Sequence, residues 1–160
     1  MLLVVGRRSS FFPTLTPFRP LITPSDFSTL HSFPVLWGDM DSARHVNNLA
    51  YLRWCETARV LYLESVGVDM SFLPGPTGII LAWQDCKYTF PMTYPDTALV
   101  GVRTVELNED RFTLQTAVFS EQHDRLAAVS KQVIVPYDYA ELRKVPLPEA
   151  WKGELMPVRC

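Results

Sequence analysis

The sequence predicts an α+β fold in which one long helix packs against an antiparallel sheet. Apolar residues recur at three- and four-residue steps from position 48 to about 66, which is the spacing of a helix. Stretches rich in β-branched and aromatic residues follow between positions 79 and 137. Such a sheet can bury a single helix only by curling around the helix. The outer sheet face and an edge strand then stay uncovered, which favours self-association.

The predicted helix has clear start and stop signals. Asn47 or Asn48 is a suitable N-cap, because an Asn side chain accepts hydrogen bonds from the first free N–H groups of a helix. Gly67 is suited to the position just past the helix, where chains often turn into the left-handed conformation. The apolar arc is broad, so we expect the helix to be buried on most sides. A short strand is predicted before it, over residues 33–37.

The strands after the helix are expected to form a meander. Glycine and proline at 74–78 break the chain, and polar turns at 108–110 and 123–124 separate later strands. The chain from Tyr139 onward contains three prolines and is expected to be irregular, with one short helix. The predicted strands run over 79–88, 97–107, 112–120 and 126–137.

The first 25 residues differ in composition from the rest of the chain. They hold three arginines and several serines and threonines, but no Asp or Glu. This composition is typical of a mitochondrial transit peptide, and it also fits a disordered tail without a targeting role. We therefore expect a flexible N-terminal extension over 1–28, a domain over 29–138 and a C-terminal tail over 139–160. The expected location is mitochondrial or cytoplasmic.

Composition and charge argue against several classes of function. A chain of 160 residues, 48% hydrophobic and 20% charged, suits one packed domain. A net charge of −2 without a Lys/Arg run argues against nucleic-acid binding. No apolar run approaches the roughly 20 residues of a membrane span. Three widely spaced cysteines fit neither a disulfide framework nor a metal site, so we expect a reducing compartment and no metal.

The most informative segment covers residues 36–51, where the predicted strand meets the helix. A carboxylate near a helix N-terminus can act as base or nucleophile on a bond whose oxygen the helix amides polarise. The segment therefore predicts a catalytic junction. Two carboxylates, an imidazole and two side-chain amides fall within ten residues there: Asp39, Asp41, His45, Asn47 and Asn48.

This segment resembles the signature of hotdog-fold thioesterases. The resemblance rests on residues 37–41 (Trp-Gly-Asp-Met-Asp), on residues 45–48 (His-Val-Asn-Asn) and on Tyr51. It is closest to the 4-hydroxybenzoyl-CoA thioesterase-like group, and the segment is also similar to the plant acyl-carrier-protein thioesterases. The likeness continues along the helix and into the next strand, and it covers roughly residues 32–138.

The resemblance implies a hotdog fold, in which a long central helix is wrapped by a curled antiparallel sheet of about five strands. It implies a dimer whose two sheets join edge to edge, with active sites at the interface, so we expect a homodimer or a homotetramer. The substrate would be a thioester of coenzyme A or of acyl carrier protein, hydrolysed to a free acid and the thiol carrier. The reaction would need neither a metal nor another cofactor.

The resemblance also assigns roles within the junction. Asp41 matches the catalytic carboxylate, which attacks the thioester carbonyl or activates a water; the other interpretation is a loop Asp that accepts backbone N–H bonds. Asn48 matches the position whose backbone N–H points at the thioester oxygen, with Asn47 as a less certain partner. His45 stands where the plant enzymes carry a functional His, and it either polarises the substrate, binds Asp41 or is structural. Asp39 is expected to fix the loop by a hydrogen bond.

Two residues depart from the family pattern. Arg44 occupies a position that is often Gly in bacterial relatives, so the turn must accept a Cβ; alternatively, Arg44 reaches a phosphate of the carrier. Ala43 replaces an Asn of the plant enzymes, so a mechanism that depends on that Asn cannot operate here. Tyr51 and Trp83 are expected to lie in the core or to form the wall of the acyl pocket. Cys55 lies among apolar residues and is expected to be core rather than nucleophile.

Two functions of different classes are therefore consistent with the sequence. The first is an acyl-CoA or acyl-carrier-protein thioesterase. The second is a non-hydrolytic protein that binds acyl thioesters, which the departures at positions 43 and 44 leave open. A hotdog dehydratase would need a His/Glu or His/Asp pair, and the helix-start signature of that family is not visible.

Overall fold

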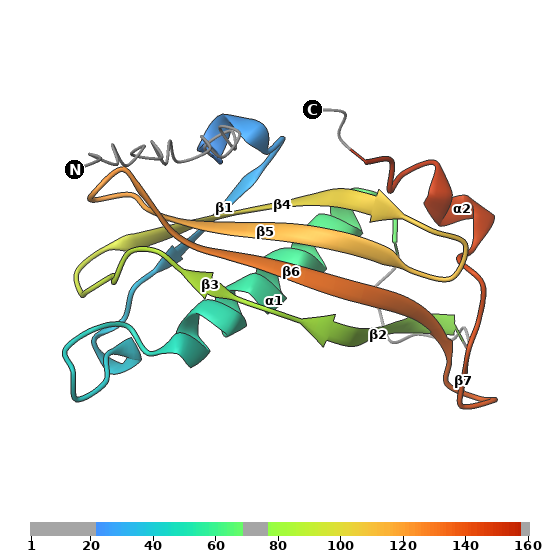
Figure 1. Cartoon of the computed structure of the whole chain (residues 1–160), viewed down its shortest axis with the longest axis horizontal. Helices are drawn as coiled ribbons and strands as arrows, with labels where there is room; N and C mark the ends of the chain where they lie inside the picture. The colour runs from blue at the N-terminus through green and yellow to red at the C-terminus, as the bar shows by residue number, and fades with distance from the viewer. Residues whose placement is uncertain (1–21, 69–76, 158–160) are drawn as a thin grey trace, which may run out of the picture.

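A computed structural model describes residues 22–68 and 77–157 of the chain. In this part, a seven-stranded antiparallel sheet curls around the long helix α1 (Asn48–Ser65), as Figure 1 shows. None of the described helices is long and apolar enough to cross a membrane. The predicted α+β class, with one long helix wrapped by a curled antiparallel sheet, is confirmed.

The central strands of the sheet agree well with the prediction. The remaining elements are η1 (Pro24–Asp26), β1 (Leu30–Pro34), η2 (Trp37–Asp39), β2 (Thr77–Gln84), β3 (Lys87–Tyr88), β4 (Thr97–Leu107), β5 (Phe112–Ser120), β6 (Arg125–Asp138), β7 (Arg143–Lys144) and α2 (Glu149–Lys152). The bounds of β4 and β5 are those predicted, and β6 extends the predicted strand by one residue at each end. These three strands carry the clearest alternation in the sequence.

The strand predicted over 33–37 begins and ends earlier in the structure. β1 ends at Pro34, and the chain then enters the 3-10 turn η2. The turn forms because the Leu36 N–H donates to the Asp39 carboxylate at 2.9 Å. The Asp39 carboxylate thus competes with the hydrogen bonds of the strand for the Leu36 N–H.

The strand predicted over 79–88 is interrupted. It forms two strands, β2 and β3, which both pair with β6. Asp85 lies between them: its carbonyl accepts from the Ser130 hydroxyl at 2.6 Å, and its carboxylate accepts from the Lys131 N–H at 2.8 Å. Side-chain and main-chain oxygens of one residue therefore continue the hydrogen bonding where the ladder breaks.

The predicted meander is correct only for β4, β5 and β6. The sheet order is β1-β4-β5-β6-β2, so β1 lies beside β4, and β2 lies at the far edge beside β6. Alternation along a strand determines which face is buried but not which strand becomes its neighbour. The connection through α1 carries the chain from one edge of the sheet to the other, a path that local sequence patterns do not contain.

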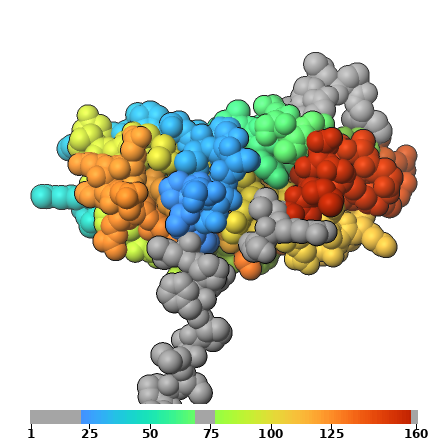
Figure 2. All heavy atoms as spheres, turned by 90° about the horizontal axis from the view of Figure 1, so that it is seen from above, coloured from blue at the N-terminus to red at the C-terminus, as the bar shows by residue number. Residues whose placement is uncertain are grey.

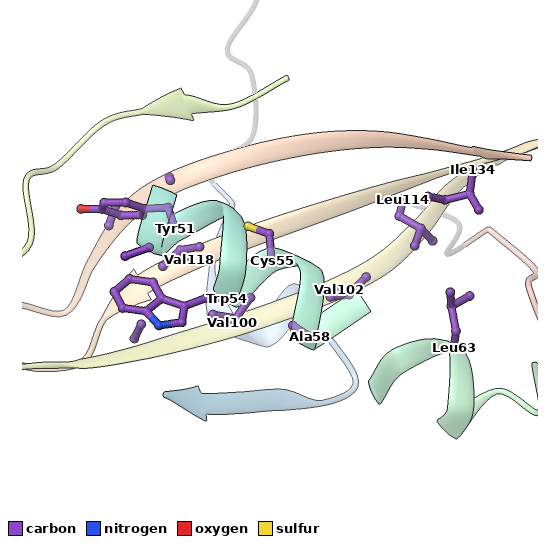
Figure 3. Close-up of a cluster of buried hydrophobic side chains, with 14 of the residues drawn as sticks. Tyr51, Trp54, Cys55, Ala58, Leu63, Val100, Val102, Leu114, Val118 and Ile134 are labelled. Carbon is purple, nitrogen blue, oxygen red and sulfur yellow. The ribbon is translucent and has the colours of Figure 1, made fainter. Parts of the chain in front are cut away.

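The main core lies between the inner face of the sheet and α1. Gly67 has a φ of 78°, the left-handed conformation expected just past a helix. Cys55 is fully buried, as the sequence predicts. Figure 3 shows the helix and strand side chains that meet here, among them Tyr51, Trp54, Cys55, Ala58, Leu63, Val100, Val102, Leu114, Val118 and Ile134.

Residues 22–28 pack against the body of the molecule. Phe27 is buried in a second apolar cluster on the outer face of the sheet. Figure 2 shows this N-terminal segment, in blue, lying against the rest of the protein. The flexible extension expected over 1–28 therefore does not hold for residues 22–28. The rest of the predicted transit peptide, residues 1–21, lies outside the described residues.

The chain beyond residue 138 also belongs to the folded body. Leu147 and Leu155 are buried in the main core. The Tyr139 hydroxyl donates to the Ile79 carbonyl on β2 at 2.9 Å. The predicted short helix is present as α2, but the segment is not a separate tail, because it covers one end of the core.

Candidate active site

The loop between η2 and α1 is closed by its own main chain. The Asp41 N–H donates to the His45 carbonyl at 2.9 Å, and the Arg44 N–H donates to the Asp41 carbonyl at 3.0 Å. The Asp41 carboxylate accepts the Ala43 N–H at 2.8 Å. In the described part of the chain, no hydrogen bond joins the His45 imidazole to this carboxylate. Asp41 thus shapes the loop and remains exposed to solvent together with Arg44 and His45.

Arg44 is held in the left-handed conformation, with a φ of 62°. The expected adjustment of the turn to a Cβ has therefore not occurred, since the backbone keeps a conformation that glycine adopts most easily. For a residue with a Cβ this conformation costs about 1–2 kcal/mol. The hydrogen bonds around Asp41 hold the loop in this shape, so the strain lies within the candidate site.

Asp39 joins the loop to the helix. It is buried, and one carboxylate oxygen accepts the Leu36 N–H while the other pairs with the Arg53 guanidinium of α1 at 2.5 Å. Its carbonyl accepts the Asn47 N–H at 2.8 Å. The interpretation of Asp39 as a residue that fixes the loop is confirmed by these contacts.

At the start of α1, the N–H of Asn48 has no hydrogen-bond partner among the described residues. The Asn47 side chain accepts the Leu49 N–H at 2.9 Å, so Asn47 is the N-cap. The Asn47 carbonyl accepts the Ala50 N–H at 2.9 Å. No hydrogen bond between described residues uses the N–H of Asn48, which lies at the positive end of the helix dipole. This N–H is available to an oxygen atom of a ligand.

A cavity of about 320 Å³ opens beside the start of α1. It is lined by Val46, Asn48, Tyr51, Tyr88, Thr89, Phe90 and Pro91. Among the predicted site residues, Asn48 and Tyr51 belong to this lining. In the single chain the lining does not include Asp41, Arg44, His45, Asn47 or Trp83. The structure therefore brings two of the predicted residues together and places the loop residues outside the cavity.

The wall of the cavity opposite the helix comes from β3 and the residues after it. Residues 88–91 lie in the strand into which the family resemblance continues, but the sequence gives no site role to Thr89, Phe90 or Pro91. Burial raises the pKa of Tyr88 to about 12, and the neighbouring Cys86 thiol adds to the rise. The Tyr88 hydroxyl is therefore protonated at neutral pH and can donate a hydrogen bond. A run of aromatic residues ending in a proline was the available signal for this wall.

Trp83 does not occupy its predicted position. Its side chain is 51% exposed on the edge strand β2, so it is neither core nor cavity wall in the single chain. The reason is a register shift between Leu81 and Trp83 in the pairing with β6. An extra residue in one strand reverses which side chains face inward beyond it. Simple alternation through this point therefore assigns Trp83 to the wrong face.

The two described cysteines are protonated at neutral pH. Burial raises the pKa of Cys55 to about 12 and also raises the pKa of Cys86. The thiolate, rather than the thiol, is the nucleophilic form. Both residues pack with the main core, which agrees with the interpretation of Cys55 as a core residue.

Comparison with protein families relates the chain to known proteins. Residues 35–155, more than half of the chain, match the model of the thioesterase-like superfamily. The chain belongs to this superfamily. A comparison with curated protein sequences gives no match. Membership confirms the resemblance read from the junction motif, and the curled sheet around one helix is the hotdog fold.

Solved structures of similar proteins share the fold of this thioesterase-like chain. The PA5185 protein of Pseudomonas aeruginosa strain PAO1 is 26% identical, with a TM-score of 0.71 over 82% of this chain and 91% of that one. A thioesterase superfamily protein from Jannaschia sp. CCS1 is 22% identical, with a TM-score of 0.75 over 88% and 94%. Slr0204, a 1,4-dihydroxy-2-naphthoyl-CoA thioesterase from Synechocystis, is 21% identical, with a TM-score of 0.70 over 79% and 93%. At these identities the last two show the fold alone.

The geometry defines what this member of the superfamily can do at the start of α1. An unused N–H at a helix N-terminus can stabilise negative charge on an oxygen atom. The aromatic lining of the cavity suits an apolar group attached to the same carbon. The site is therefore suited to an acyl group with a polarised carbonyl.

Proposed function

We propose that this protein hydrolyses a thioester of coenzyme A or of acyl carrier protein to a free carboxylic acid and the thiol carrier. The observation that carries the proposal is the N–H of Asn48, which no hydrogen bond between described residues uses, at the start of α1 and beside an aromatic-lined cavity. Membership in the thioesterase-like superfamily supports thioester hydrolysis as the reaction class. Slr0204, a 1,4-dihydroxy-2-naphthoyl-CoA thioesterase, supports a coenzyme A thioester as a substrate to test.

In the proposed reaction, Asp41 acts as the general base. Its carboxylate takes a proton from a water molecule, and the resulting hydroxide adds to the carbonyl carbon. The carbonyl oxygen becomes an oxyanion, which the Asn48 N–H stabilises. The carbon–sulfur bond then breaks, and the leaving sulfur takes the proton back from the Asp41 carboxyl. Acid and thiol are released, and the carboxylate is restored.

The remaining site residues have proposed supporting roles. His45 lies in the same exposed loop and would polarise the substrate. Arg44 has an exposed guanidinium that would bind a phosphate of the carrier. Asn47 would hold the helix start through its cap, and Tyr51 would form part of the acyl-pocket wall.

We propose that the site is completed in a homodimer or a homotetramer. The Asp41 loop is exposed, and the cavity beside Asn48 does not include Asp41 in the single chain. A second subunit that covers this region would exclude water from the substrate and strengthen each electrostatic contact. Trp83 would reach an acyl group only as part of such an assembly.

A non-hydrolytic acyl-thioester-binding protein is the alternative. One observation favours it: the Asp41 carboxylate accepts a backbone N–H from its own loop and stands outside the cavity lining. In such a protein the cavity and the Asn48 N–H would bind the acyl thioester, and Asp41 would only maintain the turn.

Replacement of Asp41 tests the proposal. The Asn of Asp41→Asn can still accept the Ala43 N–H, so the loop should keep its shape while the base is lost. We expect kcat to fall by about 100-fold or more on the best substrate of a panel of short, long and aromatic acyl-CoAs, with thiol release as readout. The matched control is Asp138→Asn, because Asp138 also accepts the N–H two residues ahead, in a turn at the end of β6. That variant should keep kcat within about twofold.

The outcomes separate the two candidate functions. If Asp41→Asn keeps the wild-type kcat, the assignment of Asp41 as base is wrong. If the wild type binds acyl-CoAs without releasing thiol across the panel, the binding protein is the correct alternative and the proposed hydrolysis is wrong.

A further inference from the structure

The hydroxyl of Tyr51 joins the helix to the opposite wall of the cavity. It accepts the Met92 N–H at 3.0 Å and donates to the Phe90 carbonyl at 3.5 Å. Tyr51 is buried, and Figure 3 shows its ring at one end of the core with the oxygen pointing out of the cluster. One side-chain oxygen therefore bridges two backbone groups of the segment that follows β3.

The same segment is bound to the motif loop from its other side. The Val46 N–H donates to the Met92 carbonyl at 2.9 Å. Met92 thus uses its N–H toward Tyr51 on the helix and its carbonyl toward Val46, two residues before Asn48. These hydrogen bonds link the loop, the first turn of α1 and the Phe90 wall to one another.

We propose that Tyr51 is a positioning residue, whose hydroxyl sets the separation between the Asn48 N–H and the Phe90 wall of the cavity. The inference rests on the proposed function, and it gives Tyr51 a positioning role beyond its place in the motif and in the cavity lining. Tyr51 does not act on the reacting atoms: it acts through the backbone of Met92 and Phe90.

The role should affect kcat more than KM. The acyl group contacts the aromatic walls in both the ground state and the transition state, so their contribution to binding largely survives a small shift. The bond from a backbone N–H to a developing oxyanion depends steeply on geometry, and displacements of about 1 Å can lower rates 100-fold. Without the hydroxyl, no hydrogen bond between described residues joins α1 to Met92 or Phe90.

Two tyrosine-to-phenylalanine variants of the full-length protein test the inference. Tyr51→Phe keeps the ring and removes the bridge. The control, Tyr62→Phe, removes another hydroxyl of α1, which hydrogen-bonds the Thr104 hydroxyl on β4 at 2.9 Å, away from the cavity lining. Both variants lose one hydroxyl that is hydrogen-bonded to a buried residue, so a similar drop in melting temperature is expected from each.

The measurements are steady-state kinetics on the best acyl-CoA and amide hydrogen exchange by NMR. For Tyr51→Phe we expect kcat to fall by about tenfold or more with KM changed by less than about threefold. The Met92 N–H should exchange at least about tenfold faster, because its acceptor is gone. Tyr62→Phe should leave kcat, KM and the Met92 exchange rate within about twofold of the wild type.

Failure of this inference is distinct from failure of the proposed function. If the wild type hydrolyses acyl-CoAs and the two variants show equal kcat, Tyr51 is only a structural residue and the inference is wrong. Unchanged Met92 exchange in Tyr51→Phe would also overturn it, whatever the kinetics. An inactive wild type would instead overturn the proposed function, and the catalytic role of Tyr51 with it.

Discussion

At the scale of single residues, burial separates side chains that can react from those that hold the fold. Asp39 is buried and paired with Arg53, whereas Asp41 is exposed in its loop. The thiols follow the same rule: Cys55 is fully buried, and burial raises its pKa to about 12. A thiol with such a pKa keeps its proton at neutral pH and is a weak nucleophile. Residue chemistry therefore favours Asp41 over a cysteine as the reactive group.

The raised pKa of Cys55 makes the stability of the fold depend on alkaline pH. The ordinary pKa is 9.0, so as pH rises above 9 the unfolded chain loses a proton that the folded chain keeps up to about pH 12. The stability linked to this thiol is complete below pH 9 and declines as pH rises toward 12. We expect the free energy of unfolding, measured by urea titration from about pH 8 to about pH 10.5, to fall more steeply for the wild type than for Cys55→Ala. Equal slopes would show that Cys55 is not responsible.

Residue roles were predictable where a local rule decides them. The start of a helix predicts Asn47 or Asn48 as the N-cap, and the structure has Asn47 in that role. The structural role of Asp39 is implied by the family resemblance, and its contacts agree with it. The position of Trp83 was not predictable, because a register shift in β2 reverses the alternation on which the prediction depends. The Phe90 wall meets the motif through bonds to residues about 40 positions away, and no local pattern encodes that contact.

At the scale of elements, the chain before β1 acts as a strap on the outer face of the sheet. The strap, defined as residues 22–28, buries Phe27 against Phe119 with the two rings edge to face at 6.1 Å. The Arg103 guanidinium lies 5.4 Å from the centre of the Phe27 ring. Beneath the ring lies Gly101, where a Cβ would come within 2.3 Å of the Phe27 side chain. Because Gly101 has no side chain, the strap can lie flat against β4 at this point.

A methyl group at position 101 should therefore displace residues 22–28 from the sheet. We expect Gly101→Ala to lower the free energy of unfolding by about 1–3 kcal/mol in urea titration, because the Phe27 ring cannot keep its position. The control is Gly153→Ala, since a Cβ there meets no heavy atom within 4 Å, and its change should stay within about 0.5 kcal/mol. If both variants unfold at the wild-type urea concentration, the strap does not contribute to stability.

Elements were predictable in the centre of the fold and less so at its edges. α1, β4, β5 and β6 follow from periodicity over long stretches, which gives a strong signal. The edge strands β1 and β2 depend on which neighbour each finds, and the strap depends on the pairing of Phe27 with Gly101, far apart in sequence. Contacts of that kind are decided by tertiary packing, so a single sequence does not reveal them.

At the scale of the whole molecule, a single chain leaves apolar surface and the candidate site uncovered. β2 is an edge strand that exposes Leu81 by 40% and Trp83 by 51%. An apolar edge strand is a ready surface for pairing with another chain. The Asp41 loop is also exposed. The homodimer or homotetramer proposed above would account for both features.

A charge on the edge strand should separate the subunits. We expect the wild type to sediment as a dimer or tetramer of the 18.2 kDa chain, and Trp83→Glu to shift toward the monomer, because a buried unpaired carboxylate opposes association. Met156→Glu, at another exposed apolar residue, should leave the assembly intact. If subunits complete the site, thioesterase activity of Trp83→Glu should fall in proportion to the lost assembly and recover at higher protein concentration. A wild type that sediments as a monomer while fully active would refute this account, because Asp41 would then work on an uncovered loop.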